Sequence, residues 1–292
     1  MRLDDKRFLI CFGCQRGGTT WLDDQLRRHP ELKLPPRKEL RYLDPIYVHN
    51  FDSIQQERLR EFRRRLHDQL GEKPQLKHSN QARELRWHAK YALVTREDYT
   101  DEWYQSLFDE SDPSSVTGDF SPDYSLLPDE GVAHLARLVP NAKLIFIMRD
   151  PVDRLISGST YVMRNAVGLS SEAAEKRLIE IANSPIQFKF SDYRSIIERF
   201  EQFFAPNQIL VIFHDHIKKS PHSLIQQVCH HLSVNFNADW FPSPVAKSIN
   251  RSPSMHIPKC LVTMAVEKLK DNLLWANDRF GGCAENWKNT YL

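Results

Sequence analysis

Three continuous apolar runs, each ending in a polar turn, dominate the hydrophobic pattern of this chain. They cover residues 8–12, 143–148 and 208–213. Apolar runs of this length without alternation are typical of parallel strands that are buried on both faces. Shorter strands are predicted over residues 32–34 and 116–118.

Each long apolar run leads into a segment with helical spacing. One helix is predicted over residues 19–28, and a second begins at Pro151. A third begins at Pro221, with Ser220 as its N-cap residue. Strands that alternate with helices predict an α/β fold of three layers, in which helices flank a central parallel sheet. We expect a single domain over residues 1–292.

The sheet pattern disappears between about residues 54 and 108, where charged and amide residues dominate. We interpret this region as a helical insertion. Its stretch ERLREFRRRLHD places Leu59, Phe62 and Leu66 on one helical face and five arginines on the others. Such arginines suit an anionic ligand, although a solvated surface helix is the commoner explanation.

Composition excludes several classes of protein. The 292 residues have a formal charge of +2, which favours neither a nucleic-acid partner nor a membrane surface. The five cysteines are odd in number and contain no CxxC pair, which disfavours a disulfide framework and a zinc site. No apolar run is long enough for a signal peptide or a membrane span. We therefore expect a soluble cytoplasmic protein.

The stretch GCQRGGTTWL, from Gly13 to Leu22, is the first candidate site, because it has the frame of a phosphate-binding P-loop. Thr19 stands where that loop carries its lysine. The cation has moved inside the loop, to Arg16. A sulfuryl group carries less charge than a terminal phosphoryl group, so one loop cation and the N–H groups of a helix N-terminus suffice without a metal. The alternative is an ordinary glycine-rich turn.

The stretch KLIFIMRDPVDRLISG, from Lys143 to Gly158, is the second candidate site. Arg149 follows a strand, and Ser157 lies about two helical turns further on. Both side chains can therefore reach one anion at the carboxyl end of the sheet. The alternative is a turn salt bridge between Arg149 and Asp150.

These two stretches resemble the phosphate-binding segments of sulfotransferases that use 3′-phosphoadenosine-5′-phosphosulfate (PAPS). The segments PRKELRYLD, WYQSLF and GDFSPDYS resemble the glycan-modifying (heparan-type) and bacterial branch of that family. The resemblance implies that PAPS is the co-substrate and 3′-phosphoadenosine-5′-phosphate (PAP) the product. It also implies that a set of residues binds the nucleotide, namely Arg16, Gly17, Gly18, Thr19, Thr20, Trp21, Arg149 and Ser157.

The same resemblance assigns further roles. Trp21 matches a tryptophan that stacks on adenine, although a core aromatic at the start of a helix is an alternative. The late stretch AKSINRSPS makes Lys247 and Arg251 candidates for closing over the 3′-phosphate, unless it is a plain surface loop. One departure is Phe120, which stands where heparan-type members have a lysine. It weakens the case for a heparan-like acceptor.

Glu39 matches the carboxylate that acts as general base in the glycan-modifying branch. A neutral hydroxyl attacks sulfur poorly, and removal of its proton lowers the barrier. The neighbouring Lys38 and Arg37 either keep Glu39 ionised or contact the sulfuryl group. Cytosolic members use a histidine instead, which leaves His49, His78 and His88 as alternatives.

The sequence thus predicts a metal-independent sulfotransferase that moves a sulfuryl group from PAPS to a hydroxyl, or less readily an amine. The acceptor is a carbohydrate, lipid or small molecule. Two alternatives stay open. One is a nucleotide kinase-like phosphotransferase, which the missing loop lysine disfavours. The other is a catalytically dead nucleotide-binding regulatory protein.

Overall fold

The computed structural model describes residues 3–70, 79–109, 112, 114–165, 170–242 and 255–292. Within these ranges, four strands form one sheet in the order β2-β1-β3-β4, and every neighbouring pair is parallel. The strands are β1 (Arg7–Gly13), β2 (Val116–Phe120), β3 (Lys143–Met148) and β4 (Ile209–Phe213). All four carboxyl ends therefore meet at the same edge of the sheet, where a ligand site is expected.

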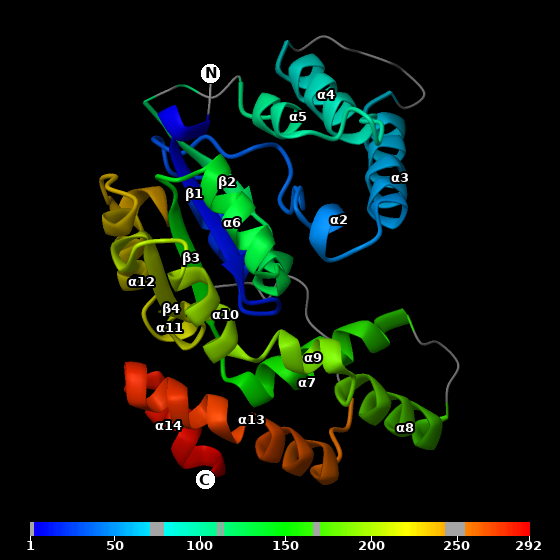
Figure 1. The fold of residues 1–292 in the computed structure, drawn as a ribbon, viewed down its shortest axis with the longest axis vertical. Coiled ribbons are helices and arrows are strands. Elements are labelled where there is room, and N and C mark those ends of the chain that lie inside the picture. Colours follow the sequence, from blue (N-terminus) through cyan, green and yellow to red (C-terminus); the bar gives the residue numbers. More distant parts are fainter. Residues whose placement is uncertain (1–2, 71–78, 110–111, 113, 166–169, 243–254) are drawn as a thin grey trace.

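Both faces of the sheet are buried, as predicted. Side chains alternate along β1, so Phe8 and Phe12 point to one face and Leu9 and Cys11 to the other. Helices α6, α7, α10 and α13 cover the first face, and α1 and α12 cover the second. The three-layer α/β prediction is confirmed (Figure 1).

The helices that connect and cover the strands have the following bounds: α1 (Thr19–Leu26), α2 (Asp44–Tyr47), α3 (Phe51–Leu70), α4 (Ser79–Ala92), α5 (Asp101–Ser106), α6 (Asp129–Leu138), α7 (Pro151–Val162), α8 (Ser171–Ala182), α9 (Pro185–Lys189), α10 (Tyr193–Glu201), α11 (Asp215–Lys219), α12 (Pro221–His231), α13 (Lys259–Phe280) and α14 (Cys283–Tyr291).

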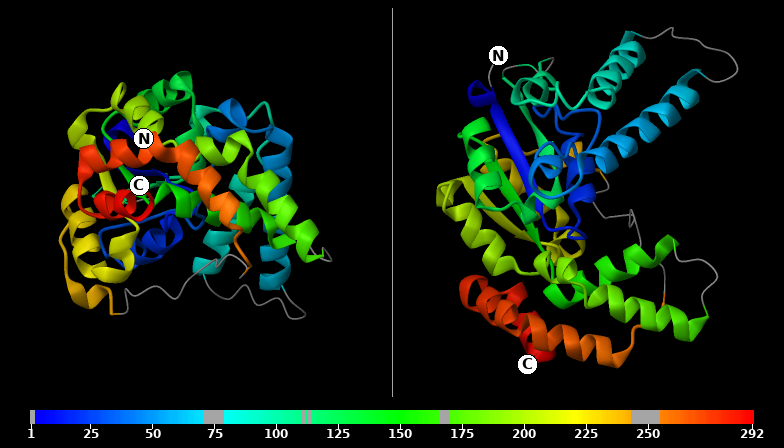
Figure 2. Two further views of the ribbon diagram at one scale, coloured as in Figure 1. Left: turned by 90° about the horizontal axis from the view of Figure 1, so that it is seen from below. Right: turned by 45° about the vertical axis from the view of Figure 1, so that its right-hand side comes forward.

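The predicted insertion is helical and consists of α3, α4 and α5. Figure 2 shows α3 and α4 projecting together from the side of the sheet. Arg58 of α3 is buried, in contrast to the solvated position expected of the arginines. Its guanidinium lies 4.8 Å from the ring centre of Tyr91 and 4.9 Å from that of Tyr99, and it donates a hydrogen bond to the carbonyl of Leu40. Arg58 therefore anchors the insertion to the segment that carries Glu39.

Several predicted boundaries were wrong. Residues 32–34 form no strand, only an isolated bridge from Leu32 to Val116. The helix predicted over residues 19–28 ends at Leu26. Ser220 precedes α12 as predicted, but its side chain makes no capping hydrogen bond. The strand predicted over residues 116–118 extends to Phe120.

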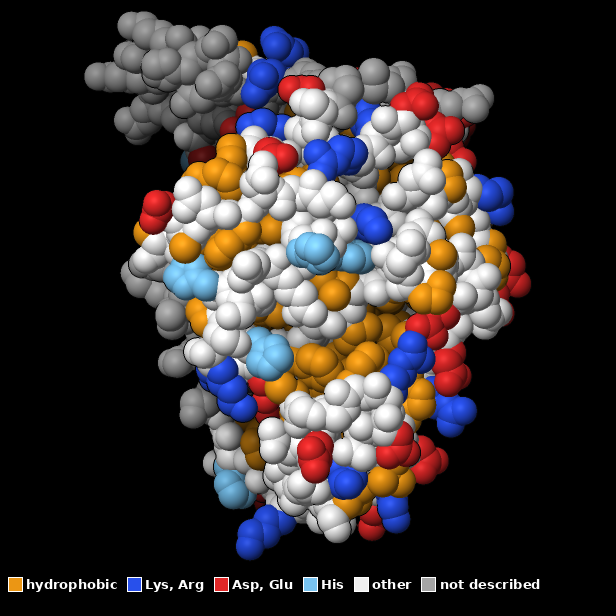
Figure 3. Space-filling model, turned by 90° about the vertical axis from the view of Figure 1, so that its left-hand side faces the viewer, with side chains coloured by type: hydrophobic (Ala, Val, Ile, Leu, Met, Phe, Trp, Pro, Cys, Tyr) orange, Lys and Arg blue, Asp and Glu red, His pale blue; other side chains and the backbone are white. Residues whose placement is uncertain are grey.

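The outer edge of the sheet at β4 is less covered than the centre. Most of its residues are only partly buried, whereas β1 and β3 are buried almost throughout. Phe213 at its end packs against Phe280 and Trp287 of the last two helices. Figure 3 shows this side of the molecule, where apolar side chains gather in a hollow.

Candidate active site

The glycine-rich loop connects β1 to α1 at the carboxyl edge of the sheet. Gly18 has a φ of 101°, a conformation that strains any other residue. A Cβ atom at Gly17 would lie 2.8 Å from the carbonyl oxygen of Ile147. The loop therefore folds tightly against β3 and aims the N-terminus of α1, with Thr19 and Thr20 in its first turn, at the space beyond the strands.

Arg16, Arg149 and Ser157 come from two distant motifs and lie together. The Arg16 Nε donates to the Ser157 Oγ at 3.3 Å. The Arg149 Nη1 donates to the carbonyl oxygen of Arg16 at 3.1 Å. The Arg16 guanidinium also lies 4.4 Å from the ring centre of Tyr161, one helical turn beyond Ser157.

These cations form a site that fits an anion. Burial lowers the pKa of Arg16, and the positive charges of Arg149 and Arg164 lower it further. The Nε of Arg149 is buried without a hydrogen-bond partner among the described residues. Arg164 stacks on Tyr161 at 3.9 Å from its ring centre. A phosphate placed among these groups would satisfy the buried donor and relieve the mutual repulsion.

Asp150 does not form the turn salt bridge with Arg149 that was the alternative for this motif. Its Oδ1 instead accepts hydrogen bonds from the backbone N–H groups of Val152 and Asp153, at 2.9 and 3.2 Å. Burial raises the pKa of Asp150 to about 6. Asp150 thus caps α7 and fixes the direction in which that helix presents Ser157.

Lys38 supplies a cation to the first turn of α1. Its Nζ lies 3.1 Å from the Thr19 Oγ1, 3.3 Å from the Thr20 Oγ1 and 2.9 Å from the Glu39 Oε1. A second segment thus places an ammonium group beside Thr19, the residue that stands where a P-loop carries its lysine. Arg37 points elsewhere, toward Glu57 and Glu61 of α3, so the suggestion that it acts on Glu39 was wrong.

Glu39 is held at the end of β2 with its carboxylate accessible. Its backbone N–H donates to the carbonyl of Phe120 at 3.0 Å, and its φ is 62°. The side chain is 44% exposed. A strained backbone around an accessible carboxylate is common at functional sites. Phe120 itself is buried in the sheet.

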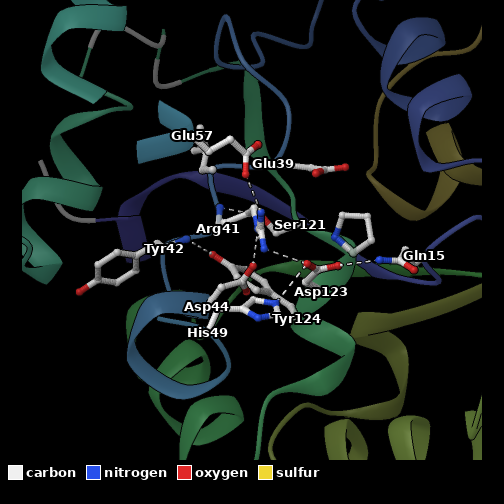
Figure 4. Close-up of polar contacts among 12 residues, drawn as sticks. Gln15, Glu39, Arg41, Tyr42, Asp44, His49, Glu57, Ser121, Asp123 and Tyr124 are labelled. Atoms are coloured by element: carbon white, nitrogen blue, oxygen red, sulfur yellow. Dashed lines mark hydrogen bonds and ion pairs between the residues drawn. The ribbon is translucent and has the colours of Figure 1, made fainter. Parts of the chain in front are cut away.

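A second polar cluster, not predicted from the sequence, surrounds Arg41 beside Glu39 (Figure 4). The Arg41 guanidinium donates to Asp44, Asp123 and Glu57 at 2.8, 3.1 and 3.3 Å. His49 lies 3.5 Å from Asp123, which also accepts from Gln15 of the glycine loop. Burial and the charge of Asp123 raise the pKa of Asp44 to about 7.

The carboxylates of this cluster have the spacing of metal ligands. Asp44, His49 and Asp123 each offer one ligand atom, and these atoms lie within 4.8 Å of one another. Arg41 already donates hydrogen bonds to both carboxylates, so its guanidinium supplies the positive charge that they need. The spacing of Arg41 and Asp44, three residues apart, is the signal in the sequence that would have revealed this pair.

The sequence of residues 9–238 matches the profile of the sulfotransferase family. That match covers most of the chain. The protein belongs to the sulfotransferase family. Its members are enzymes that use PAPS as the sulfuryl donor. The kinase-like alternative is thereby set aside.

Relatives of this sulfotransferase are distant. It is 28% identical over 147 residues to the mouse bifunctional heparan sulfate N-deacetylase/N-sulfotransferase 3, a match that covers 46% of this chain and 16% of the mouse protein. Its fold is similar to that of a sulfotransferase from Alicyclobacillus acidocaldarius, with a TM-score of 0.55, 20% identity and coverage of 91% and 95% of the two chains. It is also similar to the sulfotransferase domain of the Synechococcus PCC 7002 olefin synthase, with a TM-score of 0.52, 15% identity and coverage of 90% and 93%.

The remaining residues predicted for the site are either buried or lie outside the described ranges. Trp21 is 5% exposed and packs in the core beneath α1, which fits the core-aromatic alternative, and its contact with adenine stays a prediction. His88 is buried in the insertion. Lys247, Arg251 and His78 lie outside the described residues. Tyr161 and Arg164, which the sequence analysis missed, follow Ser157 at helical spacing, and that spacing was the available signal.

None of the helices in the described ranges combines the length and the apolar content that crossing a membrane requires.

Proposed function

We propose that this sulfotransferase moves a sulfuryl group from PAPS to a hydroxyl of a carbohydrate, lipid or small-molecule acceptor by in-line displacement. The oxygen of the attacking hydroxyl forms a bond to sulfur, and Glu39 accepts the proton of that hydroxyl. Lys38 and Arg16 offset the negative charge that grows on the departing 5′-phosphate as its bond to sulfur breaks. PAP is the other product.

The observation that carries this proposal is the position of Lys38. One ammonium group contacts both hydroxyls of the first turn of α1 and the candidate base. A cation between a helix N-terminus that fits a phosphate and an accessible carboxylate supports sulfuryl exchange at this position. Arg149 and Ser157, which both contact Arg16, are the proposed ligands of the 3′-phosphate. Nothing in this arrangement requires a metal.

Transfer of label from PAPS tests the proposal. The wild-type protein is incubated with sulfur-labelled PAPS and panels of oligosaccharide, lipid and phenolic acceptors. Lys38→Met removes the ammonium and should slow transfer by roughly 10²-fold, the scale for the loss of one preorganised donor. Lys176→Met, at an exposed position on α8, is the matched control and should keep the wild-type rate.

Two results would contradict the proposal. Wild-type rates in Lys38→Met would mean that this ammonium does not act on the reacting groups. Binding of PAP without transfer to any acceptor would favour the catalytically dead regulatory protein.

A further inference from the structure

Arg154 of α7 is a fully buried cation that is not paired with a carboxylate anywhere in the described ranges. Its Nη2 donates a hydrogen bond to the Oε1 of Gln187 in α9. Its Nε and Nη1 are buried without a hydrogen-bond partner among the described residues. No step of the proposed reaction uses this side chain.

The surroundings of Arg154 do not supply the missing negative charge. Its guanidinium lies 5.4 Å from the ring centre of Phe190. Burial lowers the pKa of Arg154 to about 10, and the positive charges of Arg149 and Arg16 act in the same direction. The side chain therefore remains protonated at neutral pH. A buried charge without a counter-charge destabilises the folded protein, so its presence here calls for a reason.

Arg154 lies directly behind the phosphate site. It precedes Ser157 by three residues, a spacing that places both on the same side of α7. A Cβ atom at Gly158 would lie 2.6 Å from the Arg154 Nη2 and 2.5 Å from the Gln187 Oε1, so this glycine leaves room for the pair. The guanidinium is therefore packed against the turn of α7 that carries Ser157.

A phosphate on the other side of that turn would supply the counter-charge. The charge of Arg154 is near enough to those of Arg149 and Arg16 to affect their interaction, and these two arginines belong to the phosphate site. The material between them is protein interior, where charges are screened less than in water. At the effective dielectric of a protein, charges several ångströms apart change an equilibrium constant by about tenfold or more.

We propose that Arg154 is a determinant of donor affinity that acts through its charge and not through contact. It attracts the 3′-phosphate of PAPS and PAP, and it destabilises the protein when no nucleotide is bound. The inference rests on the proposed function, in which Arg149 and Ser157 hold that phosphate. The competing explanation is structural, namely that Arg154 only joins α7 to α9 through Gln187.

Three variants separate the charge from the hydrogen bond. Arg154→Met removes the charge and keeps a long apolar side chain, whereas Arg154→Lys keeps the charge. Gln187→Leu is the matched control, because it removes the hydrogen bond between the two helices and leaves the charge in place. Each full-length variant is studied by calorimetry with PAP and with 5′-AMP, and by urea unfolding without nucleotide.

The affinities should follow the charge. Arg154→Met should bind PAP at least about tenfold more weakly than wild type does, with a smaller loss for 5′-AMP, which has no 3′-phosphate. Arg154→Lys and Gln187→Leu should bind PAP nearly as wild type does. With labelled PAPS and an accepted acceptor, KM for PAPS should rise in Arg154→Met while kcat changes little.

The stabilities should change in the opposite direction. Without nucleotide, Arg154→Met should unfold at the same urea concentration as wild type or a higher one, because an unpaired buried charge is gone. Gln187→Leu should unfold at a lower concentration, because it removes the hydrogen-bond partner of that charge.

Two results would overturn the inference. Equal PAP affinity in wild type and Arg154→Met would show that the charge does not act on the phosphate. A loss of folding stability in Arg154→Met as large as that in Gln187→Leu would show that the role is structural. Failure of the proposed function is distinguishable, because the wild-type protein itself would then bind PAP no more tightly than 5′-AMP or transfer no label from PAPS.

Discussion

At the scale of single residues, the proposed function uses Lys38 as the cation that the glycine loop does not carry itself. The loop keeps hydroxyls at Thr19 and Thr20, and a lysine from a different segment contacts both. The same ammonium contacts Glu39, so the cation and the candidate base are linked. In the proposed reaction, a change at either residue would therefore disturb both charge stabilisation and proton transfer.

The first prediction concerns the donor. Arg149 and Ser157 are proposed to hold the 3′-phosphate, which 5′-AMP lacks. PAP should therefore bind much more tightly than 5′-AMP in calorimetry, and Arg149→Ala should remove most of that difference. Arg137→Ala, on α6, is the control. Equal affinities of wild type for the two nucleotides would refute the assignment.

The second prediction concerns Glu39. Glu39→Gln keeps the size of the side chain but accepts no proton, so turnover should fall by about 10² to 10⁴, the usual contribution of a positioned base. Affinity for PAP should change little.

Glu97→Gln, in the loop after α4, is the matched control for Glu39 and should be as active as wild type. Near-normal turnover of Glu39→Gln would place the base elsewhere. His49, paired with Asp123 at the same edge of the sheet, would be the next residue to test.

The residues of the site were predictable to different degrees. Arg16, Arg149 and Ser157 follow strands at fixed spacings, so their convergence could be inferred from the sequence. The contact of Lys38 with Thr19 could not be inferred, because it depends on the path that residues 33–39 take alongside β2. The Arg41 cluster was missed for the same reason, since Asp123 reaches it from a distant segment.

At the scale of elements, the long apolar runs predicted the strands well because burial on both faces leaves an uninterrupted apolar signal. Residues 32–34 gave a similar but shorter signal and form only one bridge, because they lie outside β2 at the edge of the sheet. The insertion was predicted as helical from its spacing. Its attachment through the buried Arg58 was not predicted, because nothing in the sequence distinguishes Arg58 from the four other arginines of the same charged stretch, which are expected to be solvated.

The third prediction concerns α4 and pH. Burial lowers the pKa of His88 to about 4, and the charges of Arg65 and Arg37 act in the same direction, while Glu84 lies 3.6 Å from the ring. The unfolded chain binds the proton near pH 6.5, so stability is lost as pH falls from 6.5 toward 4. The loss is at most about 3 kcal/mol.

Urea unfolding at several pH values checks this prediction. His88→Gln does not titrate, so wild type should lose stability relative to the variant across that range. Asp44, Asp119 and Asp150 have raised pKa values and oppose the trend in both proteins, so only the difference is informative. The exposed His230→Gln should behave as wild type. A difference that does not change with pH would contradict the role of His88.

At the scale of the whole molecule, two surfaces meet at the carboxyl edge of the sheet. The proposed phosphate site is built from β1, α1 and α7, and the proposed acceptor side from residues 38–44, β2 and the insertion. The sequence analysis assigned residues to the phosphate site from their motifs, but it did not predict an acceptor side and said nothing of α13 and α14. These helices pack against the face of the sheet covered by α7 and α10.

The last prediction concerns metal and donor for the complete enzyme. Lys38 and Arg16 are proposed to supply the positive charge around the reacting groups, so transfer from PAPS should survive excess chelator, and ATP should not replace PAPS. Initial rates with and without chelator, with each donor, are the measurement. Chelator-sensitive transfer from ATP would contradict the proposed reaction.

The interior position of β1 has a consequence for how the chain is made. This strand leaves the ribosome before both of its neighbours, which begin only at residues 116 and 143. At typical rates of translation, its apolar surface waits on the order of ten seconds for partners. Contacts this distant in sequence also slow folding. During synthesis, residues 8–12 are therefore a natural binding site for chaperones. A nascent chain that stops before β3 lacks one of the two strands that pair with β1.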